Sequence, residues 1–259
     1  MRKLLWLIAV ILFLGFAWLV VFWPITSGHI KDGVRSYVDS IPISGNIDER
    51  KATYTLVWGF IPLKMEIQDL KMQGPRGEWD GKIFFEPVLS IKYVKLDPKK
   101  IMLNAKPEVL EMGQVDFKGK IAYRTLLAML REAYPNFHGS SIEYIKGNVV
   151  RLTGVLQEVQ SEVVFIGEFK VNESGELEFT VDRLANYLRE EILDARAKEK
   201  VLRAFKPKWH FEIMGLDLKV DKAAVSELGI YIEAESSGRK FEMPKPVITG
   251  KPEEKNKGN

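Results

Sequence analysis

The segment from Leu4 to Trp23 constrains this chain more than any other part of its sequence. All twenty of its residues are uncharged, and almost all are apolar. A helix of that length covers the roughly 30 Å hydrocarbon core of a bilayer. Arg2 and Lys3 precede it, so the positive-inside rule predicts cytoplasmic residues 1–3, a single-pass anchor in the cytoplasmic membrane and an extracytoplasmic main domain. One alternative is a cleaved signal peptide, which the missing small-residue cleavage site disfavours. The other is a buried core helix, which the uniform apolarity over this length disfavours.

The composition limits the possible partners. Hydrophobic residues make up 46% of the chain, which is enough for a real core. The net charge of +3 lies at the two ends, because Arg2, Lys3 and the tail from Lys251 account for all of it. The neutral remainder lacks the basic field that a nucleic-acid partner requires. The absence of cysteine excludes disulfides and thiolate metal sites.

Apolar and polar residues alternate in many segments after Ala52. Val115 and Phe117, for example, flank Asp116. This period of two predicts antiparallel strands with one face in water. The phase changes between Ile67 and Leu70, and again at Val94, which predicts bulges that bend the strands. We therefore expect a long, strongly curved antiparallel sheet.

Two longer segments show helical spacing instead. Tyr123–Tyr134 ends before Pro135, and Asp182–Phe205 has Asp182 as its predicted cap and ends before Pro207. Each has one apolar stripe, so we expect both helices to cover the concave side of the sheet.

The predicted organisation follows from these elements. The fold class is α+β: a curved antiparallel sheet covered by two amphipathic helices, preceded by one transmembrane helix at residues 4–23. Residues 24–51 form a connector whose amphipathic part, 28–40, either lies on the membrane or packs on the domain. The domain spans residues 52–237, and residues 238–259, rich in Pro, Lys and Glu, are predicted to be a disordered tail.

The residues that carry chemistry are scattered. His29, His138 and His210 stand far apart and show no metal-ligand spacing. The sequence contains no nucleophile elbow and no phosphate-binding loop. Asp217 and Asp221 are interpreted as turn residues, with cation binding as the alternative. We expect no enzymatic activity, no cofactor and no metal.

Three stretches of the sequence show a family resemblance. They are IKGNVVRLTG at Ile145–Gly154, VVFIGEFKVNESGELEF at Val163–Phe179 and IMLNAKPEVLEMGQVDFKGKI at Ile101–Ile121. Together they resemble the LmeA-type phospholipid-binding family of bacterial envelope proteins, whose fold is related to the tubular lipid-binding (TULIP) superfamily. The resemblance covers roughly residues 55–235, and the N-terminal helix with long strands is also similar to AsmA-type proteins. It implies a TULIP-like fold and binding of membrane lipid.

A curved sheet closed by helices encloses an apolar groove that could hold an acyl chain. We define the predicted groove wall as Leu89, Ile91, Val115, Phe117, Leu126, Leu130, Phe165, Phe169, Leu188, Ile192, Trp209, Phe211 and Ile213. The alternative is that these side chains pack on one another in a dry core. Three functions follow: lipid binding or transfer, structural assembly through a protein partner on a sheet edge, and an extracytoplasmic enzyme. The first is expected.

Overall fold

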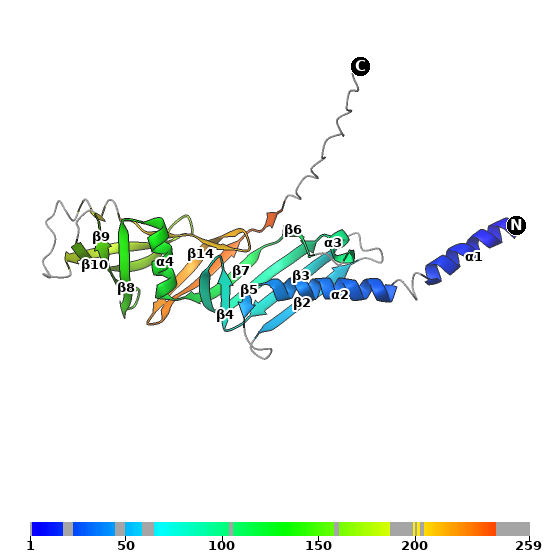
Figure 1. Ribbon diagram of the computed structural model, residues 1–259, viewed down its shortest axis with the longest axis horizontal. Helices are drawn as coiled ribbons and strands as arrows, with labels where there is room; N and C mark the ends of the chain where they lie inside the picture. Colours follow the sequence, from blue (N-terminus) through cyan, green and yellow to red (C-terminus); the bar gives the residue numbers. More distant parts are fainter. Residues whose placement is uncertain are drawn as a thin grey trace, which may run out of the picture.

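The residues that the structure describes include most of the predicted domain. The computed structural model describes residues 2–17, 23–44, 50–58, 65–103, 106–157, 161–186, 199, 201–202 and 205–241. The helices and strands, several of them labelled in Figure 1, are α1 (Arg2–Ala17), α2 (Trp23–Ser40), β1 (Ile43–Ser44), β2 (Lys51–Trp58), β3 (Met65–Gln73), β4 (Arg76–Trp79), β5 (Lys82–Leu96), α3 (Pro98–Met102), β6 (Val109–Met112), β7 (Val115–Ile121), α4 (Tyr123–Ala133), β8 (Phe137–Lys146), β9 (Val149–Leu156), β10 (Ser161–Val171), β11 (Leu177–Asn186), β12 (Lys208–Trp209), β13 (Phe211–Ile213), β14 (Leu216–Ser226), β15 (Gly229–Ser236) and β16 (Arg239–Lys240).

The N-terminal helix α1 has 16 residues. Among the described ranges, no helix combines the length and the apolar character needed to cross a bilayer. Residues 18–22 of the predicted spanning segment lie outside the described residues, so the anchor at residues 4–23 stays a prediction.

The first sheet is built around the 15-residue strand β5. Strands β4 and β3 pair along one edge of β5, and strands β7 and β6 pair along the other. Strands β15, β14 and β13 continue the sheet beyond β7. Its register shifts beside Glu86 and Asp69, both of which have a positive φ. The predicted phase change between Ile67 and Leu70 is therefore confirmed, and the bulges curl the sheet as expected.

A second sheet forms the end of the molecule farthest from α1 (Figure 1). Its strand order is β12-β11-β10-β9-β8, and all its pairs are antiparallel. The chain passes from the second sheet to the first at His210, between β12 and β13. The α+β class with curved antiparallel strands is confirmed, but the described strands form two sheets where one was expected.

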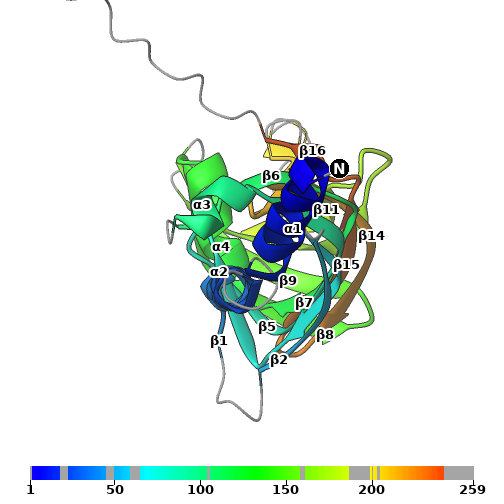
Figure 2. The same ribbon diagram turned by 90° about the vertical axis from the view of Figure 1, so that its right-hand side faces the viewer.

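The helices α2, α3 and α4 lie on one side of the curled sheets when the molecule is viewed end-on (Figure 2). In α2, Ile30, Val34 and Val38 are buried in the hydrophobic core. This settles the open choice for residues 28–40, because the apolar stripe packs on the domain. The predicted helix at Tyr123–Tyr134 is confirmed as α4, which packs on β8 and β12 through Leu126 and Leu130.

The predicted helix at Asp182–Phe205 is wrong at its start. Residues 182–186 belong to strand β11, where Leu184 pairs with Phe165. Between Val181 and Arg183 the register with β10 shifts, which leaves Asp182 as an extra residue rather than a helix cap. That bulge spaces Val181 and Leu184 three residues apart, which imitates a helical period. The remainder of the segment lies outside the described residues, except Glu199, Val201, Leu202 and Phe205.

Two smaller predictions also need correction. The predicted tail starts too early, because Arg239 and Lys240 form β16 against β6, and the Phe241 amide donates to the Leu110 carbonyl. Residues 242–259 lie outside the described residues. Asp217 and Asp221 are not turn residues but lie within strand β14, where Asp221 stands at a register shift.

Candidate functional site

The predicted groove wall is buried wherever the structure describes it. Its eleven described side chains are at most 2% exposed, and they are divided between the two sheets and α4. Leu188 and Ile192 lie outside the described residues. The side-chain alternation therefore predicted correctly which residues face inward.

The inward-facing rings contact one another. Phe117 lies edge-on to Phe84 and Trp79, with ring centroids 5.0 and 5.7 Å away. In the second sheet, Phe165 stacks on Phe205 with centroids 4.4 Å apart. Such contacts are those of a packed core. An acyl chain lying between Phe117 and its partner rings, or between Phe165 and Phe205, would have to displace them.

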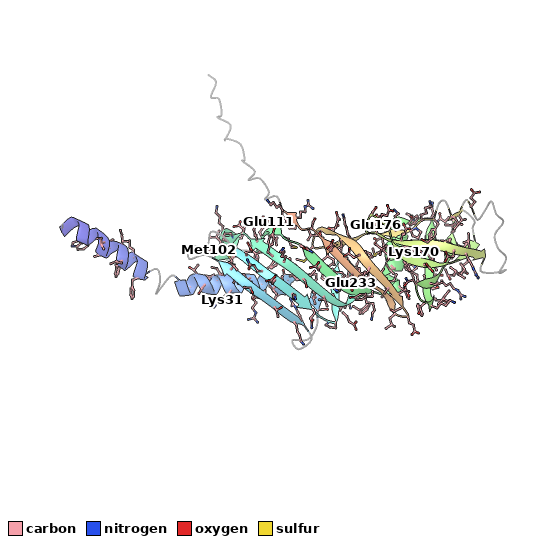
Figure 3. The ribbon with its side chains drawn as sticks, turned by 180° about the vertical axis from the view of Figure 1, so that it is seen from behind. Lys31, Met102, Glu111, Lys170, Glu176 and Glu233 are labelled. Atoms are coloured by element: carbon pink, nitrogen blue, oxygen red, sulfur yellow. The ribbon has the colours of Figure 1, made fainter. Side chains whose placement is uncertain are left out.

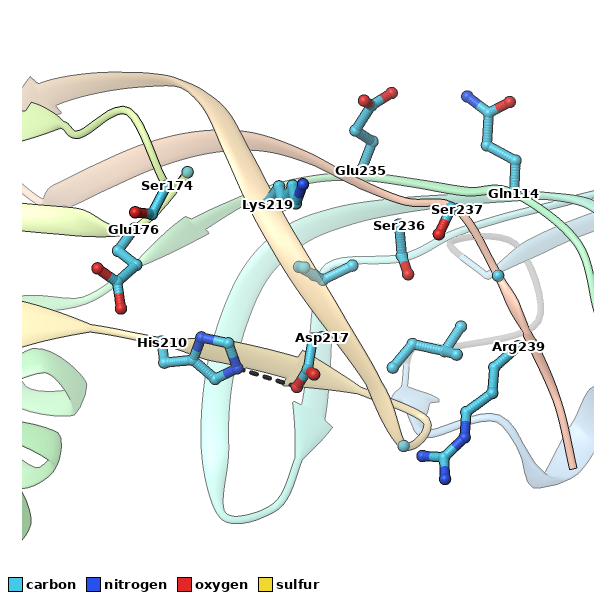
Figure 4. A pocket seen from close by; sticks show the side chains of 15 residues that line it. Gln114, Ser174, Glu176, His210, Asp217, Lys219, Glu235, Ser236, Ser237 and Arg239 are labelled. Carbon is cyan, nitrogen blue, oxygen red and sulfur yellow. Dashed lines mark hydrogen bonds and ion pairs between the residues drawn. The ribbon is translucent and has the colours of Figure 1, made fainter.

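The largest pocket that we describe lies where the two sheets meet (Figure 4). Its volume is about 760 Å³. The residues that line it come from Gln114 between β6 and β7, the β10–β11 turn, His210, the start of β14 with Gly215, and the segment 235–239 from the end of β15 to the start of β16. The pocket is thus a product of the fold, because five separate segments of the chain meet there.

The β10–β11 turn forms one side of this junction pocket. The Asn172 side-chain oxygen accepts hydrogen bonds from the amides of Ser174 and Glu176, 2.9 and 3.0 Å away. Gly175 has a φ of +77°, and a Cβ there would lie 2.9 Å from the Cβ of Lys219. Its carbonyl accepts from the Val220 amide at 2.7 Å. A glycine is therefore required where this turn contacts β14.

Charges of both signs surround the junction pocket. His210 Nε2 lies 2.9 Å from Asp217 Oδ1, and both side chains are exposed. Glu176 Oε2 accepts hydrogen bonds from the side chains of Asn172 and Lys208, which hold the pKa of this carboxyl below its ordinary value. Lys219 and Arg239 add positive charges, and Glu235 adds a negative charge. The balance of signs gives the junction pocket no preference for a strongly charged ligand.

The described residues show no cluster of metal-binding side chains. They contain no group of three or more His, Asp or Glu side chains placed to hold a metal ion. Within the same ranges, His210 makes no hydrogen bond to a serine hydroxyl, which a serine nucleophile would need for activation.

A second pocket, of about 470 Å³, lies beside Phe205 at the edge of the second sheet. We call it the Phe205 pocket. Phe179 and Phe205 are buried in its floor, and Val181 and Leu202 are half-buried beside them. The other residues that line it are Glu178, Thr180, Lys206, Pro207 and Lys208.

Two hydrogen bonds hold the wall of the Phe205 pocket against the sheet and α4. The Phe179 amide donates to the Pro207 carbonyl at 3.1 Å, and the Tyr134 hydroxyl donates to the Lys206 carbonyl at 2.5 Å. Lys206 and Lys208 are exposed at the rim. The sequence analysis missed this pocket because it assigned residues 182–205 to a helix over the sheet. The one signal in the sequence was the run Lys206-Pro207-Lys208 directly after Phe205.

Comparisons of the chain with models of protein families, with characterised proteins and with solved structures gave no match. The functional conclusion therefore rests on the sequence and geometry of this chain.

Proposed function

We propose that this chain is a membrane-tethered, non-enzymatic lipid-binding protein of the cell envelope. The observation that carries the proposal is the exposure of α1. Trp6, Ile11, Leu12 and Leu14, which point in different directions around the helix, are each at least 60% exposed to solvent. A helix with large apolar side chains on all sides is stable in a bilayer and poorly soluble in water.

The tether is the predicted spanning segment, residues 4–23, of which α1 is the described part. Arg2 and Lys3 before it favour a cytoplasmic N-terminus and an extracytoplasmic domain. This arrangement keeps the domain beside the bilayer, where the resemblance to LmeA-type proteins implies that it acts.

We assign the lipid to the Phe205 pocket, in place of the inner wall. The pocket lies in the second sheet, at the end of the domain farthest from α1, so the lipid that it holds has left the bilayer. Its apolar floor suits an acyl chain, which gains about 0.8 kcal/mol for each buried CH₂ group. Lys206 and Lys208 at the rim suit the phosphate of a phospholipid headgroup, because an ammonium donates charge-assisted hydrogen bonds to phosphate oxygens. Lys208 also pairs with Glu176, 3.1 Å away, so it joins this pocket to the junction pocket.

Photo-crosslinking tests this assignment. The full chain is reconstituted in vesicles that contain a phospholipid with a diazirine on its acyl chain, and the crosslinked peptides are identified by mass spectrometry. We expect crosslinks to the floor residues Phe179, Val181, Leu202 and Phe205. Val181→Asp places a charge in the floor and should abolish them.

The matched control is Ile145→Asp on β8 of the same sheet, where the side chain is 41% exposed. It should leave the crosslinks unchanged. The double variant Lys206→Glu/Lys208→Glu changes only exposed side chains and should weaken crosslinking to anionic lipid. Crosslinks confined to α1 would overturn the pocket assignment.

A protein partner is the second candidate function, and the edge strand β2 favours it. Among the described strands, β2 pairs with β3 alone. Tyr54 and Val57 on β2 are 39% and 43% exposed. An open edge with apolar side chains can accept a strand from a partner. A photo-crosslinker at Tyr54 that captures one discrete partner in intact cells, with no lipid crosslinks at the Phe205 pocket, would favour this function.

A further inference from the structure

The short helix α3 is held rigidly against α2. The Asp97 side chain caps it by accepting a hydrogen bond from the Lys99 amide at 2.8 Å. Ile101 is buried, and a Cβ on Gly33 of α2 would lie only 2.6 Å from its Cγ2 atom. This close approach requires the glycine and leaves α3 little freedom to turn. The residues on the outer side of α3 are therefore presented in a fixed direction.

The outer side of α3 combines exposed apolar and basic side chains. Met102 is 44% exposed and Leu103 is 78% exposed. Lys99 and Lys100 are exposed on the same turn. Lys100 lies 3.7 Å from Glu108, while Lys99 makes no ion pair in the described part of the chain. Apolar tips flanked by ammonium groups are typical of segments that enter the interface of an anionic bilayer.

This surface lies at the end of the domain that faces α1. Figure 1 places α3 beside α2 in the half of the domain nearer α1, with its contact at Gly33 of α2, and Figure 3 places Met102 at the same end. Residues 18–22, which separate α1 from α2 in the sequence, belong to the proposed spanning segment, so α2 begins at Trp23, where that segment ends. Ile25, which is 58% exposed near the start of α2, adds an apolar side chain between α1 and α3. A bilayer that holds α1 is therefore within reach of this end of the domain.

We propose that Met102 and Leu103 insert into the headgroup region of an anionic bilayer while Lys99 and Lys100 contact its lipid phosphates. This inference rests on the proposed tether, and it gives the domain a second membrane contact. Because α3 is fixed to α2, the two contacts set the angle of the elongated domain to the membrane. A tether alone would leave the domain free to swing.

The chain contains no cysteine, so single labels can be placed cleanly. Leu103→Cys, Met102→Cys and Leu228→Cys are each labelled with an environment-sensitive fluorophore in the full chain. Leu228 is the matched control because it is 74% exposed and lies in the β14–β15 turn. This turn is beside α4 rather than α3, since the carbonyl of Ser226, two residues earlier, accepts a hydrogen bond from the Tyr123 hydroxyl at the start of α4. The variants are reconstituted in mixed phosphatidylglycerol and phosphatidylcholine vesicles, and in phosphatidylcholine vesicles. Flotation of the chain together with the vesicles reports separately whether the tether is in the bilayer.

We expect the labels at positions 102 and 103 to shift to shorter emission wavelengths and to lose several-fold intensity when spin-labelled lipid is added. The label at position 228 should do neither. In phosphatidylcholine vesicles, the labels at positions 102 and 103 should show the emission seen in water. The same result is expected for Lys99→Glu/Lys100→Glu in the mixed vesicles. If the chain floats with the vesicles while all three labels keep the emission seen in water, this inference is overturned and the tether stands. Failure of the chain to float would overturn both.

Discussion

The indole Nε1 of Trp209 donates a buried hydrogen bond to the backbone carbonyl of Leu126, 3.1 Å away. The two residues are separated by 83 positions in the sequence, and the bond joins strand β12 to helix α4. Both residues belong to the predicted groove wall. They stabilise each other across the interior of the second sheet, which is the behaviour of core residues.

Trp209→Phe should destabilise the chain more than Trp79→Phe does. Both substitutions remove the same atoms from a buried site, but Trp79 Nε1 has no hydrogen-bond partner among the described residues. A hydrogen bond contributes about 1 kcal/mol net, and a buried donor without a partner is a cost. Urea unfolding of the full chain should show a difference of about 1–2 kcal/mol between the two variants. Equal losses would contradict the role of the Trp209 bond.

Tyr37→Phe should be neutral, or should raise the free energy of unfolding by about 1 kcal/mol. The Tyr37 hydroxyl on α2 is buried without a partner in the described part of the chain, and burial raises the pKa of this group. Tyr123→Phe is the matched control, because the Tyr123 hydroxyl donates to the Ser226 carbonyl at 2.6 Å. It should cost about 1 kcal/mol. A large loss in Tyr37→Phe would show that the hydroxyl has a partner.

The stability of the chain should fall in acid partly through Glu111. Hydrogen bonds from Lys95 and Tyr93, 2.5 and 2.7 Å long, hold the pKa of Glu111 below its ordinary value of 4.5. The unfolded chain then binds more protons than the folded chain. The stabilisation is complete above a pH of about 4.5 and is lost as the pH falls through the lower folded pKa.

Unfolding titrations across this pH range test the assignment to Glu111. The free energy of unfolding of Glu111→Gln should fall less steeply with decreasing pH, and the gap to the wild type should close at low pH. Tyr93→Phe, which removes one of the two donors, should give an intermediate slope. Identical slopes in all three proteins would rule out a contribution from Glu111.

Two glycine substitutions should change stability in opposite directions. A Cβ on Gly167 would lie 2.1 Å from the Thr180 carbonyl oxygen, at the bulge between β10 and β11. Gly167→Ala should therefore cost about 2–4 kcal/mol. A Cβ on Gly28 would meet nothing within 4 Å, and Gly28→Ala should stabilise helix α2 by about 0.5–1 kcal/mol. Thermal unfolding of both variants checks the two signs; a tolerated Gly167→Ala would mean that the bulge can relax.

Local patterns were sufficient for several elements. The apolar spacing predicted α4 and the amphipathic stripe of α2, and the change of phase beside Asp69 predicted a bulge. These features depend on neighbours in the chain, which the sequence displays directly. The pattern failed at Asp182, because a bulge in a strand and one turn of a helix both put apolar residues three positions apart.

The Phe205 pocket and the α3 surface could not be predicted from local spacing. The pocket forms because Phe179 on β11 and Phe205 come from separate segments, which the fold brings together. In α3, two exposed apolar residues follow one buried isoleucine, and the sequence does not indicate that Gly33 of α2 is the neighbour that buries it.

The sequence by itself determined which face of each strand points inward, because side-chain direction along a strand is a local property with a period of two. It also determined the apolar character of residues 4–23. Only the tertiary structure decided that the described inward-facing side chains pack on one another. Whether a curved sheet encloses a groove or a core depends on how far rings such as Phe117 and Trp79 reach across it, and those rings come from strands that folding brings together.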